Sequence, residues 1–188
     1  MICNKDRAFW IGASDTSYVV GNWETMSFKK WWLEKMGLRR NTLQTKAMKC
    51  GNAFEHLILD AIGCEKDKQL CFPEIALRIN YDGTIGTSNI YEVKTHRIDK
   101  RFKVTTNYWK QAQVELYGFK REYEIIPNLQ IVSYPLSDRE YANYFAEIDP
   151  QRLTFHNIEY DKEFIEDQYI PRLKRLHEAL KKGVMPHE

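Results

Sequence analysis

Hydrophobic residues recur at helical spacing in two segments of the first third of the chain. Residues 27–37 carry apolar side chains three or four positions apart, and Gly37 can end the helix that this spacing predicts. Residues 45–63 carry a second apolar stripe, which ends near Gly63. Inside this second predicted helix Gly51 costs about 1 kcal/mol relative to alanine, so it indicates a close approach of another segment.

Shorter apolar runs predict strands in the rest of the chain. The first two lie around residues 74–81 and 90–95, and a later pair covers residues 122–127 and 129–136. Residues 153–160 have the pattern of one more strand. We expect all of these strands to join one central sheet.

Two further helices accompany these strands. Residues 107–119 place apolar side chains on one side at helical spacing. Asp161 can cap a last long helix that runs to Gly183, with Pro171 as a kink or break. No repeat, low-complexity tract or flexible linker divides the chain. The order of elements therefore predicts a mixed α/β fold, a central mixed sheet flanked by helices, in a single domain over residues 1–188.

Composition excludes several classes of protein. Hydrophobic residues make up 43% of the 188 positions, which is too many for a disordered chain. No apolar run is long enough to cross a bilayer, and the first residues lack the apolar stretch of a signal peptide. We therefore expect a soluble, cytoplasmic protein without a membrane partner. The cysteines lack the paired short spacing of zinc or iron–sulfur sites, so we expect free thiols at Cys3, Cys50, Cys64 and Cys71.

Positive charge is concentrated in one part of the chain. Residues 94–121, here called the basic band, hold eight Lys or Arg against two acids, a net charge of +6. The net charge of the following residues to the end is −5, from eight basic and thirteen acidic residues. Such a run is most often solvated surface, but this one begins at Lys94, beside candidate catalytic groups. It therefore indicates an anionic partner on one face, and Arg97 is one of the candidate contacts.

The segment from Tyr81 to His96 reads as a hairpin that carries unusual charges. A loop with two glycines can fold the chain back so that Asp82 lies beside Glu92. Two neighbouring carboxylates repel each other unless a cation lies between them. Carboxylate oxygens, a backbone carbonyl and waters are the ligands that Mg²⁺ prefers, and the carbonyl of Val93 is well placed to join them.

Lys94 extends this arrangement. Side chains alternate along a strand, so Glu92 and Lys94 point to the same face. The lysine can orient or help deprotonate a metal-bound water and stabilise charge on a phosphate, as metal-assisted phosphodiester hydrolysis requires. The alternative is a surface ion pair, worth less than about 1 kcal/mol.

Four sequence blocks, taken together, resemble one family of enzymes. In chain order they are IGASDTS (11–17), CGNAFEH (50–56), NYDGTIGTSNIYEVK (80–94) and NYWKQAQVELYG (107–118). This order resembles the PD-(D/E)xK nuclease superfamily and, within it, the lambda-exonuclease (YqaJ-type) viral recombinases. The resemblance covers almost the whole chain and implies a restriction-endonuclease-like core. A departure is RINYDG, where the superfamily often has Pro-Asp before the glycine.

The resemblance implies roles for the charged residues of the hairpin and the second helix. Asp82 and Glu92 correspond to metal-binding residues, and Lys94 corresponds to the catalytic lysine. Glu55 corresponds to an additional carboxylate from a helix, which supports the metal or the water. Its alternative is a glutamate on the helix surface.

The resemblance also implies an active-site glutamine and several residues that contact DNA. Gln111 corresponds to the active-site glutamine, but Gln113 with the tyrosine four residues later fits the related RecB-type pattern. Ser14 can cap a short helix and, with Arg7, corresponds to residues that hold a terminal 5′-phosphate. Asn80 corresponds to a position where the family can carry a serine, and the resemblance implies a further phosphate contact there.

The function that the resemblance implies is a Mg²⁺-dependent deoxyribonuclease, with Mn²⁺ as a possible substitute. It would trim the 5′-ended strand of double-stranded DNA for recombination, as a ring-shaped trimer that serves a single-strand annealing protein. If the source is viral, the compartment would be the host cytoplasm. Tyr108 and Trp109 would stack on bases or belong to the core. The alternatives are a structure-selective or helicase-associated nuclease of the RecB type and a non-catalytic DNA-binding protein on the same fold.

Overall fold

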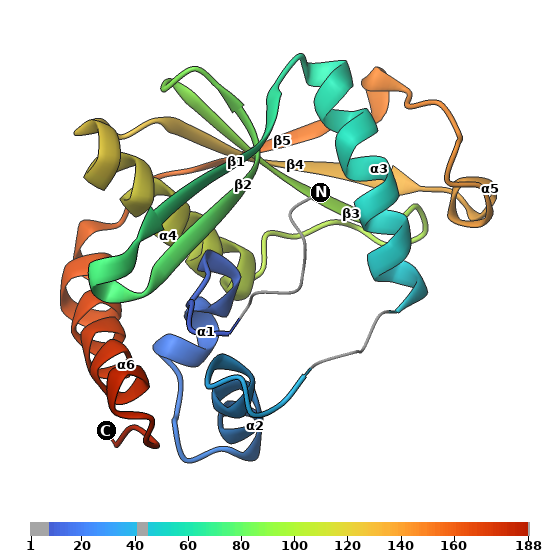
Figure 1. Ribbon diagram of the computed structural model, residues 1–188. Helices are drawn as coiled ribbons and strands as arrows, with labels where there is room; N and C mark the ends of the chain where they lie inside the picture. The colour runs from blue at the N-terminus through green and yellow to red at the C-terminus, as the bar shows by residue number, and fades with distance from the viewer. Residues whose placement is uncertain (1–7, 41–44, 188) are drawn as a thin grey trace.

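The computed structural model describes residues 8–40 and 45–187 and has one five-stranded sheet at its centre (Figure 1). The strands lie in chain order: β1 (Glu65–Phe72), β2 (Leu77–Ile85), β3 (Asn89–Arg97), β4 (Asn128–Leu136) and β5 (Thr154–Ile158). The β3–β4 pair is parallel and the other pairs are antiparallel. The predicted mixed α/β class with a central mixed sheet is confirmed.

Helices surround this sheet. The longer ones are α2 (Met26–Lys35), α3 (Lys46–Ile62), α4 (Thr106–Tyr123) and α6 (Ile170–Lys182). The shorter ones are η2 (Ala13–Asp15), α1 (Thr16–Val19), η3 (Pro73–Ile75), α5 (Asp138–Ala142) and η4 (Pro150–Arg152). A π-helical segment, η5 (Phe164–Tyr169), leads directly into α6. Figure 1 shows α1 and α2 together at one end of the molecule, and α6 contacts α1 and η3.

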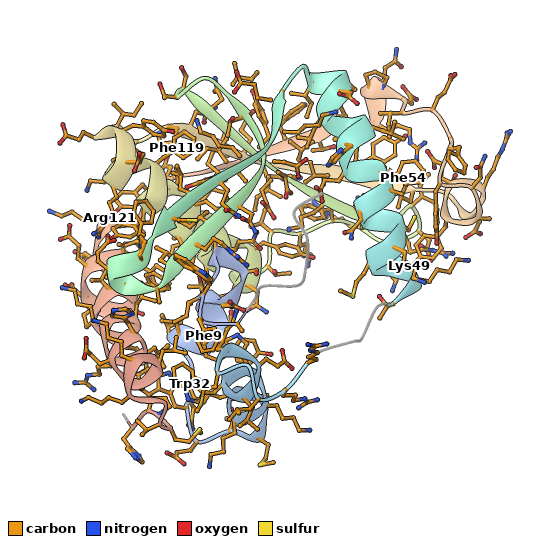
Figure 2. All side chains as sticks on the ribbon, in the orientation of Figure 1. Phe9, Trp32, Lys49, Phe54, Phe119 and Arg121 are labelled. Atoms are coloured by element: carbon orange, nitrogen blue, oxygen red, sulfur yellow. The ribbon has the colours of Figure 1, made fainter. Side chains whose placement is uncertain are left out.

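The two longest helices pack against different hydrophobic clusters. Phe54 of α3 is fully buried in a cluster with Val93 and Val132, whereas Phe119 of α4 is fully buried in a larger cluster with Ile131 (Figure 2). Because side chains alternate along a strand, Val132 and Ile131 lie on opposite faces of β4. Helices α3 and α4 therefore cover opposite faces of the centre of the sheet.

Threonine side chains begin three of the helices. The hydroxyl oxygens of Thr25, Thr45 and Thr105 accept hydrogen bonds from backbone N–H groups at the starts of α2, α3 and α4. Gly63 ends α3 at a φ of 79°, a left-handed conformation that suits glycine. The helices predicted over residues 27–37, 45–63 and 107–119 are confirmed in kind, with shifted boundaries.

The strands differ from the predictions in three places. β1 was not predicted, because its first five residues, EKDKQ, are polar. The strand expected at 74–81 begins only at Leu77, after a 3₁₀ turn. Residues 122–127 form no strand, because α4 continues to Tyr123 and Glu124 ends it at a φ of 59°.

The last helix begins as predicted. The Asp161 carboxylate accepts the N–H of Phe164 at 2.9 Å. Pro171 lies in the first turn of α6, directly after the π-helical segment, where its missing N–H interrupts the helical bonding. Among the residues that the structure describes, no helix is both long and apolar enough to span a membrane.

Candidate active site

The sheet divides at the place where Asp82 and Glu92 lie. β2 and β3 pair only through Gly83–Tyr91, Thr84–Ile90 and Ile85–Asn89. Beyond these pairs, β2 remains bonded to β1 and β3 remains bonded to β4. Asp82 and Glu92 are thus the first residues past the last pair, one on each side of the opening.

The Asp82 carboxylate takes the place of a ladder bond in this opening. Its Oδ2 accepts the backbone N–H of Val93 at 2.9 Å. The aspartate is therefore held between the strands, beside the residue that precedes Val93, which is Glu92. The hairpin brings the two predicted metal-binding carboxylates together.

Glu92 is 3% exposed and is the centre of the cluster. Its Oε1 accepts hydrogen bonds from Lys94 Nζ and, at 2.6 Å, from Gln111 Nε2. Lys94 Nζ also lies 5.2 Å from the ring centroid of Tyr108 on α4. A carboxylate from the sheet, a lysine two residues later and a glutamine from α4 thus meet at one oxygen atom.

Burial and mutual repulsion perturb the acids of the cluster. Burial first, then the charges of Glu92 and Glu55, raise the pKa of Asp82 well above its ordinary value. Burial, followed by the charge of Glu92, raises the pKa of Glu55 on α3 to about 7. Glu55 therefore belongs electrostatically to the cluster, although it comes from a different helix.

For Lys94, burial and the neighbouring negative charges shift the pKa in opposite directions. Burial lowers its pKa, but the charges of Glu92 and Asp82 outweigh burial and raise the pKa above its ordinary value. Lys94 is therefore an ammonium ion at neutral pH. In this state it can orient a water or stabilise negative charge, but it cannot accept a proton.

The donor set fits a hard divalent cation. Within residues 8–40 and 45–187 no three His, Cys, Asp or Glu side chains are arranged to hold a metal ion by themselves. Mg²⁺ commonly takes one or two carboxylates and keeps several waters. Asp82 and Glu92 can supply the carboxylates, the Val93 carbonyl can add an oxygen, and Glu55 can act through a bound water.

The two candidate glutamines have different surroundings. Gln111 faces Glu92, as described above. Gln113 is fully buried and bridges α4 to the segment after β5, because it donates to Glu159 O at 2.8 Å and accepts from Asp161 N at 2.7 Å. The geometry therefore favours Gln111 for the active-site position.

Sequence reasoning missed Glu115, which lies one helical turn after Gln111. Its side chain is fully buried, and its Oε1 accepts from Gln111 Nε2 at 2.9 Å. The signal was the spacing: an acid four residues after the glutamine, between the apolar neighbours Val114 and Leu116.

The residues that were predicted to contact phosphate have different surroundings from one another. Ser14 is exposed and does not cap α1, whose N-cap residue is Asp15. The Asp15 carboxylate accepts the N–H of Gly12 at 2.8 Å, at the start of η2. The capping prediction is wrong because the 3₁₀ turn η2 comes directly before α1 and contains Ser14. Asn80 is exposed on β2 and accepts from Gln69 Nε2 at 2.7 Å. Arg7 lies outside the described residues.

Ser14 lines a polar groove over α1 and α2. One part has a volume of about 420 Å³, and an adjoining part has about 370 Å³. Both parts share Ser14, Tyr18 and Ser27. Asn107 at the start of α4 lines the first part, and Lys30 and Arg39 line the second.

The basic band does not form one face. Arg97 forms an ion pair with Asp138 and lies over the Tyr141 ring. Arg121 forms an ion pair with Glu74 at 2.6 Å. The exposed cations are concentrated in the loop between β3 and α4, at Lys100, Arg101 and Lys103. This loop joins the strand of Lys94 to the helix of Gln111.

Tyr108 and Trp109 are only partly exposed. Tyr108 stacks on Phe102 with ring centroids 6.1 Å apart, and Trp109 meets Phe164 edge-on at 4.9 Å. Both pack against the larger hydrophobic cluster. Their alternative interpretation as core residues fits better than base stacking.

No protein-family model and no curated protein matches this sequence. Several solved structures do match over most of the chain. An alkaline exonuclease from Laribacter hongkongensis has 18% identity and a TM-score of 0.66, covering 94% of this chain and 90% of that one. The structure of that enzyme in complex with dAMP has 19% identity and a TM-score of 0.68, and the match covers the same shares of the two chains.

A phage-related exonuclease from Haemophilus somnus 129PT has 14% identity and a TM-score of 0.66, covering 93% of this chain and 96% of that one. This chain therefore shares the fold of alkaline and phage-related exonucleases. The predicted resemblance to the lambda-exonuclease type is confirmed at the level of the fold.

Proposed function

We propose that this protein is a divalent-metal-dependent deoxyribonuclease that degrades double-stranded DNA from its ends, in the 5′-to-3′ direction. The observation that carries the proposal is the meeting of Asp82, Glu92, Lys94 and Gln111 where the sheet divides. The shared fold with exonucleases supports the same reaction class.

Each group of the cluster has a task in hydrolysis. A bound Mg²⁺, held by Asp82 and Glu92, would polarise the phosphate and lower the pKa of a coordinated water. Lys94, as an ammonium ion, stabilises the negative charge that develops on the phosphate oxygens. Gln111 holds Glu92 in place, and Glu55 would hydrogen-bond a water in the cluster.

The surroundings suggest how DNA would lie. The loop cations Lys100, Arg101 and Lys103 can contact phosphates beside the cluster. The polar groove with Ser14 and Tyr18 can hold the end of one strand, and Arg7 would assist with its 5′-phosphate. By the same resemblance we propose a ring-shaped trimer, a recombination role and a partner protein that anneals single strands.

Two other functions remain testable alternatives. A RecB-type nuclease would use the same cluster without a preference for a 5′-phosphate. A non-catalytic DNA-binding protein would need neither the cation nor Lys94, so the assembled cluster favours an enzyme.

The proposal is tested with linear duplex DNA labelled on each strand in turn, with and without a 5′-phosphate. We expect progressive loss of the 5′-ended strand in Mg²⁺ or Mn²⁺, none in EDTA, and faster loss when the phosphate is present. Lys94→Ala should lower the rate by roughly 100-fold or more, since it removes the positive charge that stabilises the transition state.

Lys162→Ala is the matched control. Lys162 is exposed and forms a 3.6 Å ion pair with the exposed Glu166, so its loss should leave the rate unchanged. DNA that stays intact with the wild type in every metal would exclude the nuclease and leave the binding protein. Equal rates with and without the 5′-phosphate would favour the RecB-type alternative.

A further inference from the structure

Glu115 is a buried acid whose one side-chain hydrogen-bond partner among the described residues belongs to the candidate active site. Its Oε1 accepts from Gln111 Nε2 at 2.9 Å, and the residue is 0% exposed. Its Oε2 is buried without a hydrogen-bond partner among the described residues. A buried carboxylate with an unpaired oxygen costs free energy, so its presence calls for a reason other than stability.

The bond pattern shows what Glu115 does to the amide of Gln111. A carboxamide has two N–H donors on its nitrogen and a carbonyl oxygen that can only accept. Gln111 Nε2 donates to Glu92 Oε1 at 2.6 Å and to Glu115 Oε1 at 2.9 Å. Two acceptors on one nitrogen determine which way the amide points, because a flipped amide would set its carbonyl oxygen against carboxylate oxygens.

Glu115 is itself held firmly. Its backbone carbonyl accepts the hydroxyl of Tyr81 at 3.0 Å, and this bond ties α4 to β2 one residue before Asp82. Gly118 allows the contact, since a Cβ there would lie 2.6 Å from the Tyr81 hydroxyl oxygen. The position of Glu115 is therefore set by the same strand that carries Asp82.

From this geometry we propose that Glu115 is a positioning residue, which fixes the Gln111 amide so that it holds Glu92 and presents its carbonyl oxygen to the reacting water or phosphate. The proposal rests on the proposed nuclease function. It adds a residue that acts through Gln111 and does not itself touch DNA or metal.

The test compares Glu115→Gln with Glu115→Met on 5′-phosphorylated duplex DNA in Mg²⁺. Glutamine keeps an acceptor for the Gln111 N–H, so kcat should stay within about threefold of the wild type. Methionine has similar size but no acceptor, so kcat should fall by roughly 10- to 100-fold with KM for DNA little changed. Removal of the unpaired buried oxygen should leave Tm unchanged or raise it.

Gln113→Met is the matched control, since Gln113 is an equally buried polar residue two positions earlier on α4. It bridges to backbone groups of Glu159 and Asp161, so its loss should lower Tm and leave kcat near the wild-type value. Opposite effects on Tm and kcat in the two variants separate positioning from a structural role.

A double variant tests whether Glu115 acts through Gln111. Gln111→Met with Glu115→Met should be no slower than Gln111→Met alone, because the second change has nothing left to position. Rate losses that multiply would overturn the proposal, and so would a Glu115→Met enzyme with wild-type kcat. A Glu115→Gln enzyme as slow as Glu115→Met would also overturn it.

A second readout does not depend on activity. In ¹⁵N NMR spectra without metal, the side-chain NH₂ signal of Gln111, identified by its loss in Gln111→Met, should persist in Glu115→Gln and shift in Glu115→Met. An unchanged signal in Glu115→Met would overturn the proposal even if Glu115→Met fails to turn over DNA. If the wild type hydrolyses no DNA, the proposed function fails, and the catalytic purpose of Glu115 fails with it.

Discussion

At the scale of single residues, the surroundings of a buried carboxylate decide its charge. Asp82 lies among other acids, and burial together with their charges raises its pKa. Glu140 on α5 is 6% exposed, but it receives hydrogen bonds from Arg152 and Ser137. Burial alone would raise the pKa of Glu140, but these bonds outweigh it and lower the pKa to about 2. Asp82 therefore needs a cation to offset this repulsion, whereas Glu140 already has one, the guanidinium of Arg152.

This difference gives a prediction about pH and stability. The folded-state pKa of Glu140 lies below its unfolded value, so its stabilising effect is present above pH 4.5 and is lost as the pH falls from 4.5 towards 2. The linked free energy is about 3 kcal/mol at pH 7 and about 1 kcal/mol at pH 3. Glu140→Gln should therefore lower the free energy of unfolding much more at pH 7 than at pH 3, as measured by urea denaturation.

Glu166→Gln supplies the comparison for that measurement. Glu166 is paired with Lys162 at 3.6 Å, and both side chains are more than half exposed. Its loss should change the free energy of unfolding by less than about 0.5 kcal/mol at either pH. A Glu140→Gln effect that is the same at pH 3 and pH 7 would contradict the assigned pKa.

At the scale of elements, helix α4 connects the hydrophobic core with the candidate site. Its apolar side packs in the larger cluster, and its polar residues Gln111 and Glu115 face the opening between β2 and β3. The distance between α4 and β2 is set at Gly118, where a Cβ would lie 2.4 Å from Ile79 Cδ1. A shift of α4 would therefore move the site as well as the core.

Two glycines inside helices give a matched test of this packing. Gly118→Ala should cost about 1–3 kcal/mol of stability, because the added methyl overlaps Ile79 and Tyr81, and it should also reduce nuclease activity. Gly51→Ala in α3 should gain up to about 1 kcal/mol, because within the described residues its Cβ would meet only Thr95 Oγ1, at 3.4 Å. Chemical denaturation measures both changes. A stabilised Gly118→Ala variant would show that α4 does not need this close approach.

At the scale of the whole molecule, the opening in the sheet is a compromise between stability and chemistry. Continuing the β2–β3 ladder past Gly83 and Tyr91 would add hydrogen bonds but would close the gap that Asp82 fills. The gathered acids then repel one another in the folded protein more than in the unfolded chain. A cation that binds there should therefore stabilise the whole fold.

This predicts a thermal shift that needs no turnover. At a Mg²⁺ concentration of about ten times Kd, binding adds about 1.4 kcal/mol, or about 3–5 °C in Tm for a chain of this size. Asp82→Asn should abolish most of this increase, with NaCl at matched ionic strength as the blank. An equal increase in the variant would mean that Mg²⁺ acts elsewhere on the surface.

The sequence by itself determined the features that depend on neighbouring residues. Apolar stripes and a terminal glycine predicted the helices, and alternation predicted that Glu92 and Lys94 share a face. The glycine-containing loop predicted the return of Asp82 towards Glu92. These patterns are local, because a helix repeats within four residues and a hairpin closes within about ten. The fold class and the main strands of the site followed from them.

Only the tertiary structure decided the features that depend on contacts between distant segments. Gln111 and Gln113 are two positions apart on one helix, and only the packing of α4 shows that one faces Glu92 and the other Glu159. The polar strand β1 forms because β2 offers it an edge, which no local pattern reveals. Glu115 gains a role only through the Gln111 amide that meets Glu92. Register and packing over long separations therefore complete a site that local patterns could only outline.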